Sequence, residues 1–224
     1  MSRQTNIQIP TDTWIVGTWE EYLQVLDSLS EQKNKSYFHC NHIRLEMSPV
    51  SNEHSRDHNI ILYAVNLFAT LKNIELNGND NCSYRQPGVR EAQPNVSFYI
   101  GKIAKSIPWG TGIINLDKYP PPTLVIEVAK TSLLDDQGNK RSLYEALGVE
   151  EYWIIDVEQG KILAFAMNTK GSFRINESQV LSGLDISLLE TALQRTRKMS
   201  HSEVGAWLLT QFQHTWQGFS DYIA

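Results

Sequence analysis

The chain has 224 residues, of which 41% are hydrophobic and 20% charged, with a formal net charge of −5. These values are typical of one globular domain with a sizeable core, and they argue against a protein that coats nucleic acid through a broad basic surface. No apolar run approaches the roughly 18 residues that a membrane-spanning helix needs. Residues 1–5 lead into no signal-type apolar segment, so we expect a cytoplasmic protein.

The first half of the chain alternates between helical and extended patterns. Thr18 and Glu21 have the spacing of a capping box ahead of an apolar stripe, and Ser51 or Asn52 can cap a second, longer helix. The cluster of Asn, Gly and Asp at 77–81 indicates a turn. The pattern therefore predicts a helix over about 18–30, a hairpin of strands 37–40 and 43–47 that turns near Asn41, a helix to about 72, and a turn at 77–81.

The second half predicts a mixed α/β domain. A helix that connects two strands is a crossover, which would make the strands on either side of it parallel. In chain order we expect a strand at 95–100, a loop over 101–122, a strand at 123–128, a helix over 136–147 ended by Gly148, strands at 152–157 and 161–166, and a helical tail from about 186.

Glu127 is the most informative residue of the chain. It lies in the apolar run Thr123-Leu124-Val125-Ile126-Glu127-Val128, which has the composition of a buried central strand. On a strand, Glu127 shares a face with Val125, and an isolated charge buried there would be costly. The pattern indicates either a structural ion pair or a metal or catalytic site, and the strand by itself leaves both open.

Lys140 follows Glu127 on the next predicted helix, on the same face as Leu143 and Tyr144. Asp136 precedes it by four residues and can pair with it. One interpretation is that the Lys140 ammonium extends past the core to water. The other is that Lys140 and Glu127 share a site, in which case a partly exposed Lys140 could be replaced by alanine with a loss of activity and little change in stability.

Other polar side chains are weaker candidates. His54 and His58 are one helical turn apart, a spacing that can bind zinc, but the intervening residues do not form a zinc-protease motif. A histidine in a first helical turn is more often exposed or hydrogen-bonded. Glu46 lies within a predicted strand and is either a third acidic group of a site or the solvent-facing residue of an alternating strand.

Taken in order, several motifs resemble a cyanobacteria-rich restriction-endonuclease family of the Uma-two type. They are Met47-Ser48-Pro49 followed by His54, Gln93-Pro94-Asn95 with the strand after it, Pro121-Pro122 with the Glu127 strand, Asp136 to Lys140, and 148–153. The resemblance covers about residues 12–170. It implies the PD-(D/E)xK nuclease-like fold, a mixed sheet flanked by helices, here as a single domain over 1–224 with a C-terminal helical extension at about 180–224.

The resemblance also implies roles for individual residues. Glu127 matches a metal ligand on a strand, Lys140 matches a catalytic lysine that has moved to the following helix, and Glu46 and His54 match neighbours of the same site. Asn95 departs from the family pattern, which has aspartate after the proline. Its amide oxygen can still bind a hard cation, but it is neutral, whereas Mg²⁺ prefers carboxylates.

The activity that the resemblance implies is hydrolysis of DNA phosphodiester bonds with Mg²⁺ or Mn²⁺, weakened by Asn95. The alternative is a nuclease fold without catalysis that binds DNA or a protein. A structural oligomerisation module is a third interpretation. Its only support is the apolar C-terminal helix at about 200–212, and we expect that the protein could form a homodimer.

Overall fold

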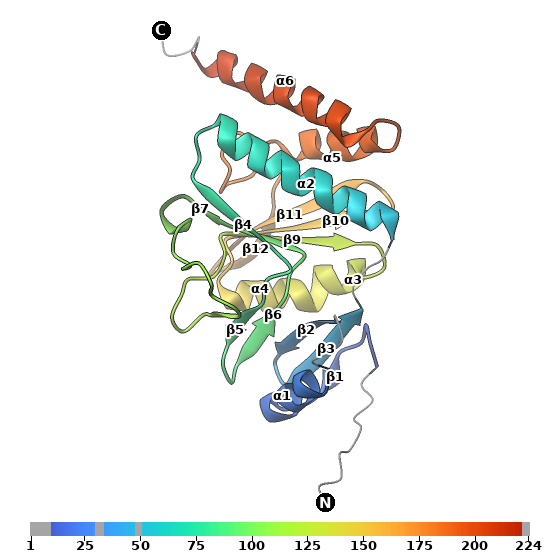
Figure 1. Cartoon of the computed structure of the whole chain (residues 1–224), viewed down its shortest axis with the longest axis vertical. Helices are drawn as coiled ribbons and strands as arrows, with labels where there is room; N and C mark the ends of the chain where they lie inside the picture. The colour runs from blue at the N-terminus through green and yellow to red at the C-terminus, as the bar shows by residue number, and fades with distance from the viewer. Residues whose placement is uncertain (1–9, 30–33, 48–50, 221–224) are drawn as a thin grey trace, which may run out of the picture.

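The computed structural model describes residues 10–29, 34–47 and 51–220, with side chains as far as 213. These residues form two six-stranded mixed sheets and the helices that pack on them (Figure 1). The predicted restriction-endonuclease-like α/β class, a mixed sheet flanked by helices, is confirmed. None of the described helices is long and apolar enough to cross a membrane. The single-domain organisation stays a prediction.

The larger core surrounds the central sheet, whose strand order is β12-β11-β10-β9-β7-β4. Strands β9 and β10 are parallel, as the crossover between them predicted, and Glu127 lies opposite Ile154 in their register. Neighbouring β7 runs antiparallel to β9. The strands are β4 (Leu76–Asp80), β7 (Val96–Ile100), β9 (Leu124–Ala129), β10 (Glu151–Asp156), β11 (Lys161–Asn168) and β12 (Gly171–Arg174).

The second sheet contains the predicted hairpin and has the order β1-β3-β2-β6-β5-β8. The hairpin turns at Cys40 and Asn41, which both have positive φ as a tight two-residue turn requires. Helix α1 (Trp19–Ser28) packs beside it and begins with the predicted capping box at Thr18. The strands are β1 (Ile15–Val16), β2 (Asn34–His39), β3 (His42–Met47), β5 (Tyr84–Gln86), β6 (Arg90–Ala92) and β8 (Ile114–Asn115).

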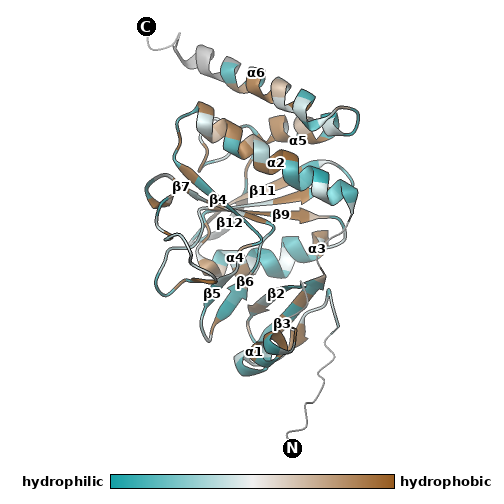
Figure 2. Ribbon diagram, in the orientation of Figure 1, coloured by the Kyte–Doolittle hydropathy of each residue, from teal (hydrophilic) through white to brown (hydrophobic). Residues whose placement is uncertain are grey.

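Helices cover the two faces of the central sheet differently. On one face α2 (Asn52–Leu71) packs against α5 (Ile186–Thr196) and α6 (His201–Ser220) over an apolar core (Figures 1 and 2). On the other face lie α3 (Leu133–Asp135), the π-helix η2 (Asp136–Lys140) and α4 (Arg141–Leu147). The expected loop at 101–122 carries the short helix η1 (Gly101–Ile103) in addition to β8.

The predicted turn at 77–81 is wrong, because residues 76–80 form β4 at the edge of the central sheet. Gly78 pairs with Phe98 there, and a Cβ at Gly78 would lie 2.8 Å from the Phe98 ring. A turn-type residue is therefore used for close packing within a strand. Only Asn81, with a φ of 51°, keeps the conformation that the turn signal indicated.

The helix predicted at 136–147 begins earlier and is not regular. Three residues of α3 lead into the π-helix, and neither Asp135 nor Asp136 caps a helix with its side chain. The wider π turn holds both Asp136 and Lys140 inside the protein, at 0% and 1% exposure. Gly148 ends α4 with a φ of 83°, as predicted.

Candidate active site

A cluster of five charged side chains lies buried between β9, the β2–β3 hairpin and η2. It contains two lysines and three acids, each at most 8% exposed: Lys35, Glu46, Glu127, Asp136 and Lys140. Three different elements of secondary structure supply the acids. Because burying an unpaired charge is costly, each of these groups needs its partners in place.

Glu127 is held from both sides. Its Oε1 accepts a hydrogen bond from the hydroxyl of Tyr144 at 2.7 Å. The hydroxyl of Tyr37 is 3.2 Å from the same oxygen and shares its one proton between it and the Gln93 carbonyl oxygen at 2.9 Å. Its Oε2 accepts from the backbone N–H of Asn95 at 3.3 Å. Glu127 is on the face of β9 that Val125 shares, as strand parity predicted.

Lys140 is the centre of the cluster. Its Nζ is 2.6 Å from Glu46 Oε1, 2.9 Å from Asp136 Oδ1 and 3.9 Å from Glu127 Oε1. The structure therefore brings Lys140 together with Glu127 and confirms its pairing with Asp136. The alternative in which Lys140 reaches water is wrong, as is the expected partial exposure, because the side chain is 1% exposed. Replacing Lys140 would leave three carboxylates without their main partner. The expectation that Lys140→Ala would barely change stability depended on a partly exposed lysine, so it no longer holds.

Sequence reasoning missed Lys35. This lysine is 4% exposed on β2, and its Nζ is 3.9 Å from Glu127 Oε2. Burial lowers its pKa, and the charge of Glu127 opposes that effect. The signal was present in the alternation of the strand, since Lys35 shares a face with Tyr37, but the predicted strand began at residue 37, three residues after the observed start at Asn34.

The acids of the cluster differ in their affinity for protons. Burial alone would raise the pKa of Glu46, but Lys140 and then Arg44 outweigh it and lower this pKa to about 2. Burial raises the pKa of Asp136 to about 6, and the charge of Glu127 adds to the rise while Lys140 opposes it. Arg44, which is 4% exposed, pairs with Glu46 at 3.0 Å and with the partly buried Asp135 at 3.2 Å. Four carboxylates therefore face three basic groups, and the fully ionised site has an excess negative charge.

Asn95 precedes β7 and lies beside the cluster, as predicted. Its Oδ1 accepts a hydrogen bond from the backbone N–H of Val128 at 3.0 Å, which fixes the orientation of the amide. Its Nδ2 then faces His54 Nε2 at 3.4 Å. His54 is 5% exposed, and burial together with the neighbouring His58 lowers its pKa to about 4. His54 is therefore neutral at neutral pH, with Nε2 as an acceptor.

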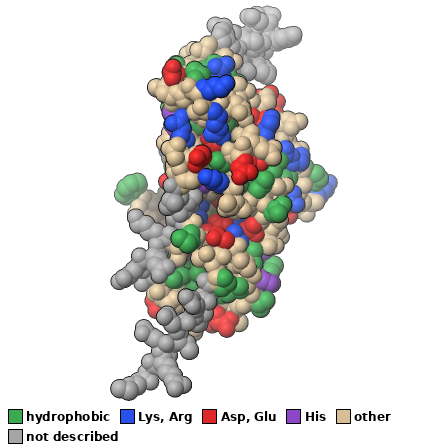
Figure 3. All heavy atoms as spheres, turned by 90° about the vertical axis from the view of Figure 1, so that its right-hand side faces the viewer, with side chains coloured by type: hydrophobic (Ala, Val, Ile, Leu, Met, Phe, Trp, Pro, Cys, Tyr) green, Lys and Arg blue, Asp and Glu red, His purple; other side chains and the backbone are tan. Residues whose placement is uncertain are grey.

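A small cavity of about 70 Å³ opens beside the cluster. Its volume is enough for a few water molecules or a small ion. Acidic and basic side chains gather at mid-height on the face of the molecule shown in Figure 3. The cavity is lined by Asp12, Lys35, Glu46, Met47, His54, Asn95, Val128, Lys130, Thr131, Ser132 and Lys140.

The oxygen donors of this site fit a hard divalent cation in type and in charge. Glu46 and Asn95 line the cavity, Glu127 lies behind them, and the cluster has an excess of negative charge. Asp136 Oδ1 is a buried oxygen for which no hydrogen-bond donor is found among the described residues, apart from its ion pair with Lys140. Within the same residues no three His, Cys, Asp or Glu side chains form a ready-made metal cluster. Any cation would therefore share its ligands with water or substrate, as Mg²⁺ commonly does.

The zinc spacing of His54 and His58 has another explanation. Their rings are 6.0 Å apart, and His58 Nε2 is 3.2 Å from Asp80 Oδ1. His54 Nε2 faces Asn95 instead, so the two histidines have different partners.

Comparisons with known proteins point to one family. The family model Uma2, described as "Putative restriction endonuclease", matches residues 19–214. A crystal structure described as a "putative nuclease belonging to DUF820", from Anabaena variabilis ATCC 29413, is similar with a TM-score of 0.50 and 14% sequence identity. That likeness covers 86% of this chain and 99% of the other, and it concerns the fold alone. No curated protein matches the sequence.

Proposed function

We propose that this chain, which belongs to the Uma2 family of restriction endonucleases, hydrolyses DNA phosphodiester bonds with Mg²⁺ or Mn²⁺ at the Glu127 cluster. The observation that carries the proposal is the surplus of carboxylates over basic groups, four against three when Arg44 and its partner Asp135 are counted, beneath a cavity. A purely structural ion pair would balance its charges and would need no cavity. A site that takes a cation and a phosphate needs both the surplus and the space.

Two residues would hold the metal ion, Glu127 and Asn95, and Glu46 is a neighbour that lines the cavity as Asn95 does. When bound, the ion would supply a polarised phosphate and a water of lowered pKa. Tyr37 and Tyr144 keep the Glu127 carboxylate in one orientation through their hydroxyl groups. These two tyrosines are therefore positioning residues in the proposal.

The two lysines would divide the electrostatic work. Burial would lower the pKa of Lys140, but Glu127, Asp136 and Glu46 raise it well above its ordinary value, so it stays charged and cannot act as a general base. It lines the cavity and would stabilise negative charge on the phosphate while it holds Glu46 and Asp136. Lys35, whose pKa is lowered, is the better candidate for orienting the attacking water.

The test is cleavage of supercoiled plasmid DNA by the purified protein with Mg²⁺ or Mn²⁺. We expect nicking that EDTA abolishes and that Glu127→Gln reduces at least 100-fold. The neighbouring substitution Ile126→Val, on the opposite face of the same strand, is the matched control and should cleave like the parent. Metal-dependent cleavage by Glu127→Gln at the parental rate would refute the site.

A second candidate is a protein of the same fold that binds DNA or a protein without cleaving. The observation that favours it is the state of Asn95, whose amide is neutral and whose oxygen is already bonded to the Val128 N–H. In that case the parent would bind DNA with similar affinity in EDTA and in Mg²⁺, and no plasmid would be nicked. Binding and cleavage measured on the same preparation separate the two candidates.

A further inference from the structure

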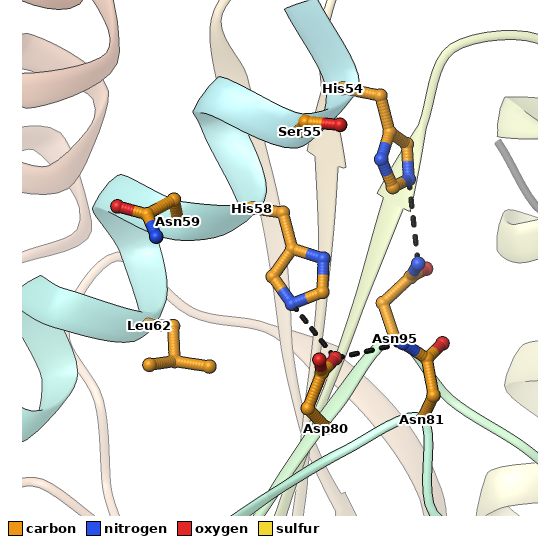
Figure 4. A pocket seen from close by; sticks show the side chains of 8 residues that line it. All are labelled: His54, Ser55, His58, Asn59, Leu62, Asp80, Asn81 and Asn95. Atoms are coloured by element: carbon orange, nitrogen blue, oxygen red, sulfur yellow. Dashed lines mark hydrogen bonds and ion pairs between the residues drawn. The ribbon is translucent and has the colours of Figure 1, made fainter. Parts of the chain in front are cut away.

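A second, larger pocket adjoins the candidate active site. It has a volume of about 350 Å³, within the range of about 300–1,000 Å³ that small-molecule sites occupy. The two cavities share His54 and Asn95, so these two side chains form the wall between them. Helix α2 supplies one side of the pocket, and the end of β4 with Asn81 and Asn95 supplies the other (Figure 4). It is lined by His54, Ser55, His58, Asn59, Leu62, Asp80, Asn81 and Asn95.

The two cavities differ in chemistry. Three lysines line the smaller one, whereas the larger one has no lysine or arginine among the described residues that line it. Its walls carry amides, imidazoles, one hydroxyl, one leucine and, at the far end, one carboxylate. Amides and imidazoles hydrogen-bond to the edges of nucleobases, and imidazole rings stack on their faces. The larger pocket is therefore suited to a neutral polar ring, and the smaller one to a phosphate.

The far end of the larger pocket is an acidic edge. His58 Nε2 lies 3.2 Å from Asp80 Oδ1, and Asn81 Nδ2 donates to the same oxygen at 2.9 Å (Figure 4). Among the described residues nothing is bonded to the other oxygen, Oδ2. The Asp80 side chain is 59% exposed. A carboxylate oxygen in this position can accept a hydrogen bond from an exocyclic amino group of a base.

We propose that this pocket binds one unpaired nucleotide next to the phosphate at the Glu127 cluster, so that the protein prefers DNA with an unpaired or extruded base. The inference rests on the proposed function, because it places the DNA backbone in the smaller cavity. A base inside a duplex is stacked and cannot enter such a pocket, whereas a mismatched or bulged base is extruded at little cost.

The experiment measures binding and not cleavage. Fluorescence anisotropy in EDTA compares three DNA duplexes of one sequence: fully paired, with one bulged adenine, and with an abasic residue in place of that adenine. We expect the bulged adenine to bind about 10-fold more tightly than the abasic bulge, since a stacked base contributes on that scale. The abasic duplex has the same number of phosphate charges and lacks only the base, so this ratio reports the contribution of the base.

A substitution on the rim tests the location. Ser55→Leu fills the pocket from an exposed position of α2 and should bring the ratio close to 1. Thr70→Leu is the matched control, because both hydroxyls donate to the carbonyl four residues earlier in the same helix, and Thr70 lies outside the pocket.

Each outcome distinguishes the two proposals. Equal affinity of the parent for the adenine and abasic bulges would overturn the pocket and leave the nuclease proposal standing. If Ser55→Leu kept the parent's ratio of affinities for the adenine and abasic bulges, the base would bind elsewhere and the proposed pocket would be wrong. No binding to any of the three duplexes, in EDTA or with Ca²⁺ in its place as the divalent cation, would overturn the DNA-directed function together with the pocket.

Discussion

The two faces of strand β9 show how one element serves two kinds of interior. Leu124, Ile126 and Val128 point into the large apolar core beneath α2, α5 and α6. Val125, Glu127 and Ala129 point to the other side, where Glu127 enters the charged cluster. The first face is held by many interchangeable contacts, and the second by a few specific ones.

The difference matters for how each face responds to change. In an apolar core, a lost methyl group removes some burial and leaves a small cavity. In the charged cluster, a lost side chain leaves its partners ionised and unpaired in a poorly solvated place. The apolar face should therefore tolerate substitution in proportion to size, and the polar face hardly at all.

The largest expected effect is that of Lys140→Met. This change removes the ammonium group that is within 4 Å of three buried carboxylates, and we expect unfolding to become easier by about 3–5 kcal/mol in urea titrations. Lys161→Met is the control, because Lys161 pairs with Glu190 at 2.8 Å but is largely exposed. Its effect should stay below about 1 kcal/mol. If Lys140→Met and Lys161→Met lost the same free energy of unfolding, the buried cluster would be no more sensitive to substitution than a surface ion pair.

The second effect is a pH dependence from Asp136. Its pKa is raised from 3.8 to about 6 in the folded protein, so that between these values the folded state binds more protons than the unfolded state. The free energy of unfolding should therefore fall as the pH rises from about 4 to about 6, by about 3 kcal/mol at most. Asp136→Asn should remove this fall. Glu46, with a pKa lowered to about 2, acts in the opposite direction and at lower pH, where stability is lost as the pH falls below about 4.5.

The third prediction concerns the apolar side, which also contains one ion pair. Arg197 of the segment after α5 donates from Nη1 and Nη2 to the two oxygens of Asp57 on α2, at 2.5 and 2.6 Å. Arg197→Met should cost about 2 kcal/mol, because it leaves the buried Asp57 unpaired while a partly exposed arginine is lost. Plasmid cleavage per folded molecule should be unchanged. If Arg197→Met were as stable as the parent but cleaved DNA more slowly, the Arg197–Asp57 pair would contribute to activity and not to stability.

The smallest expected effect is that of Ile126→Val, at about 1 kcal/mol by thermal or urea unfolding. It removes one methylene from the apolar face of β9, next to Glu127 in sequence but on the other side of the sheet. If this change altered metal binding as strongly as Glu127→Gln, the two faces of β9 would not be independent.

The sequence predicted the elements with strong periodicity and the direction in which their side chains point. The parity of β9 placed Glu127, the capping signals placed α1 and α2, and the crossover gave the parallel pair. Local signals failed where tertiary contacts decided the outcome. The edge strand β4 forms from turn-type residues because β7 is available to pair with them, and the π turn at 136–140 follows from the burial of both its charged ends.

The same limit explains the site residues. Lys35 and the two tyrosines that hold Glu127 come from segments 90 residues before and 17 residues after it, and no local pattern joins them. The state of Asn95 was equally out of reach, because its hydrogen bond to Val128 depends on how β7 and β9 are placed. Part of the Met47-Ser48-Pro49 motif lies outside the described residues.

We propose that the Glu127 cluster binds a divalent metal ion and that the neutral amide of Asn95 limits this binding. The most direct measurement is calorimetric titration of Mg²⁺ and Mn²⁺ into the parent and Asn95→Asp, with plasmid cleavage measured on the same samples. We expect tighter metal binding and faster cleavage for Asn95→Asp, because a second carboxylate would join Glu127 beside the cavity. Unchanged metal affinity, with neither protein nicking DNA, would contradict it and leave a nuclease fold that only binds.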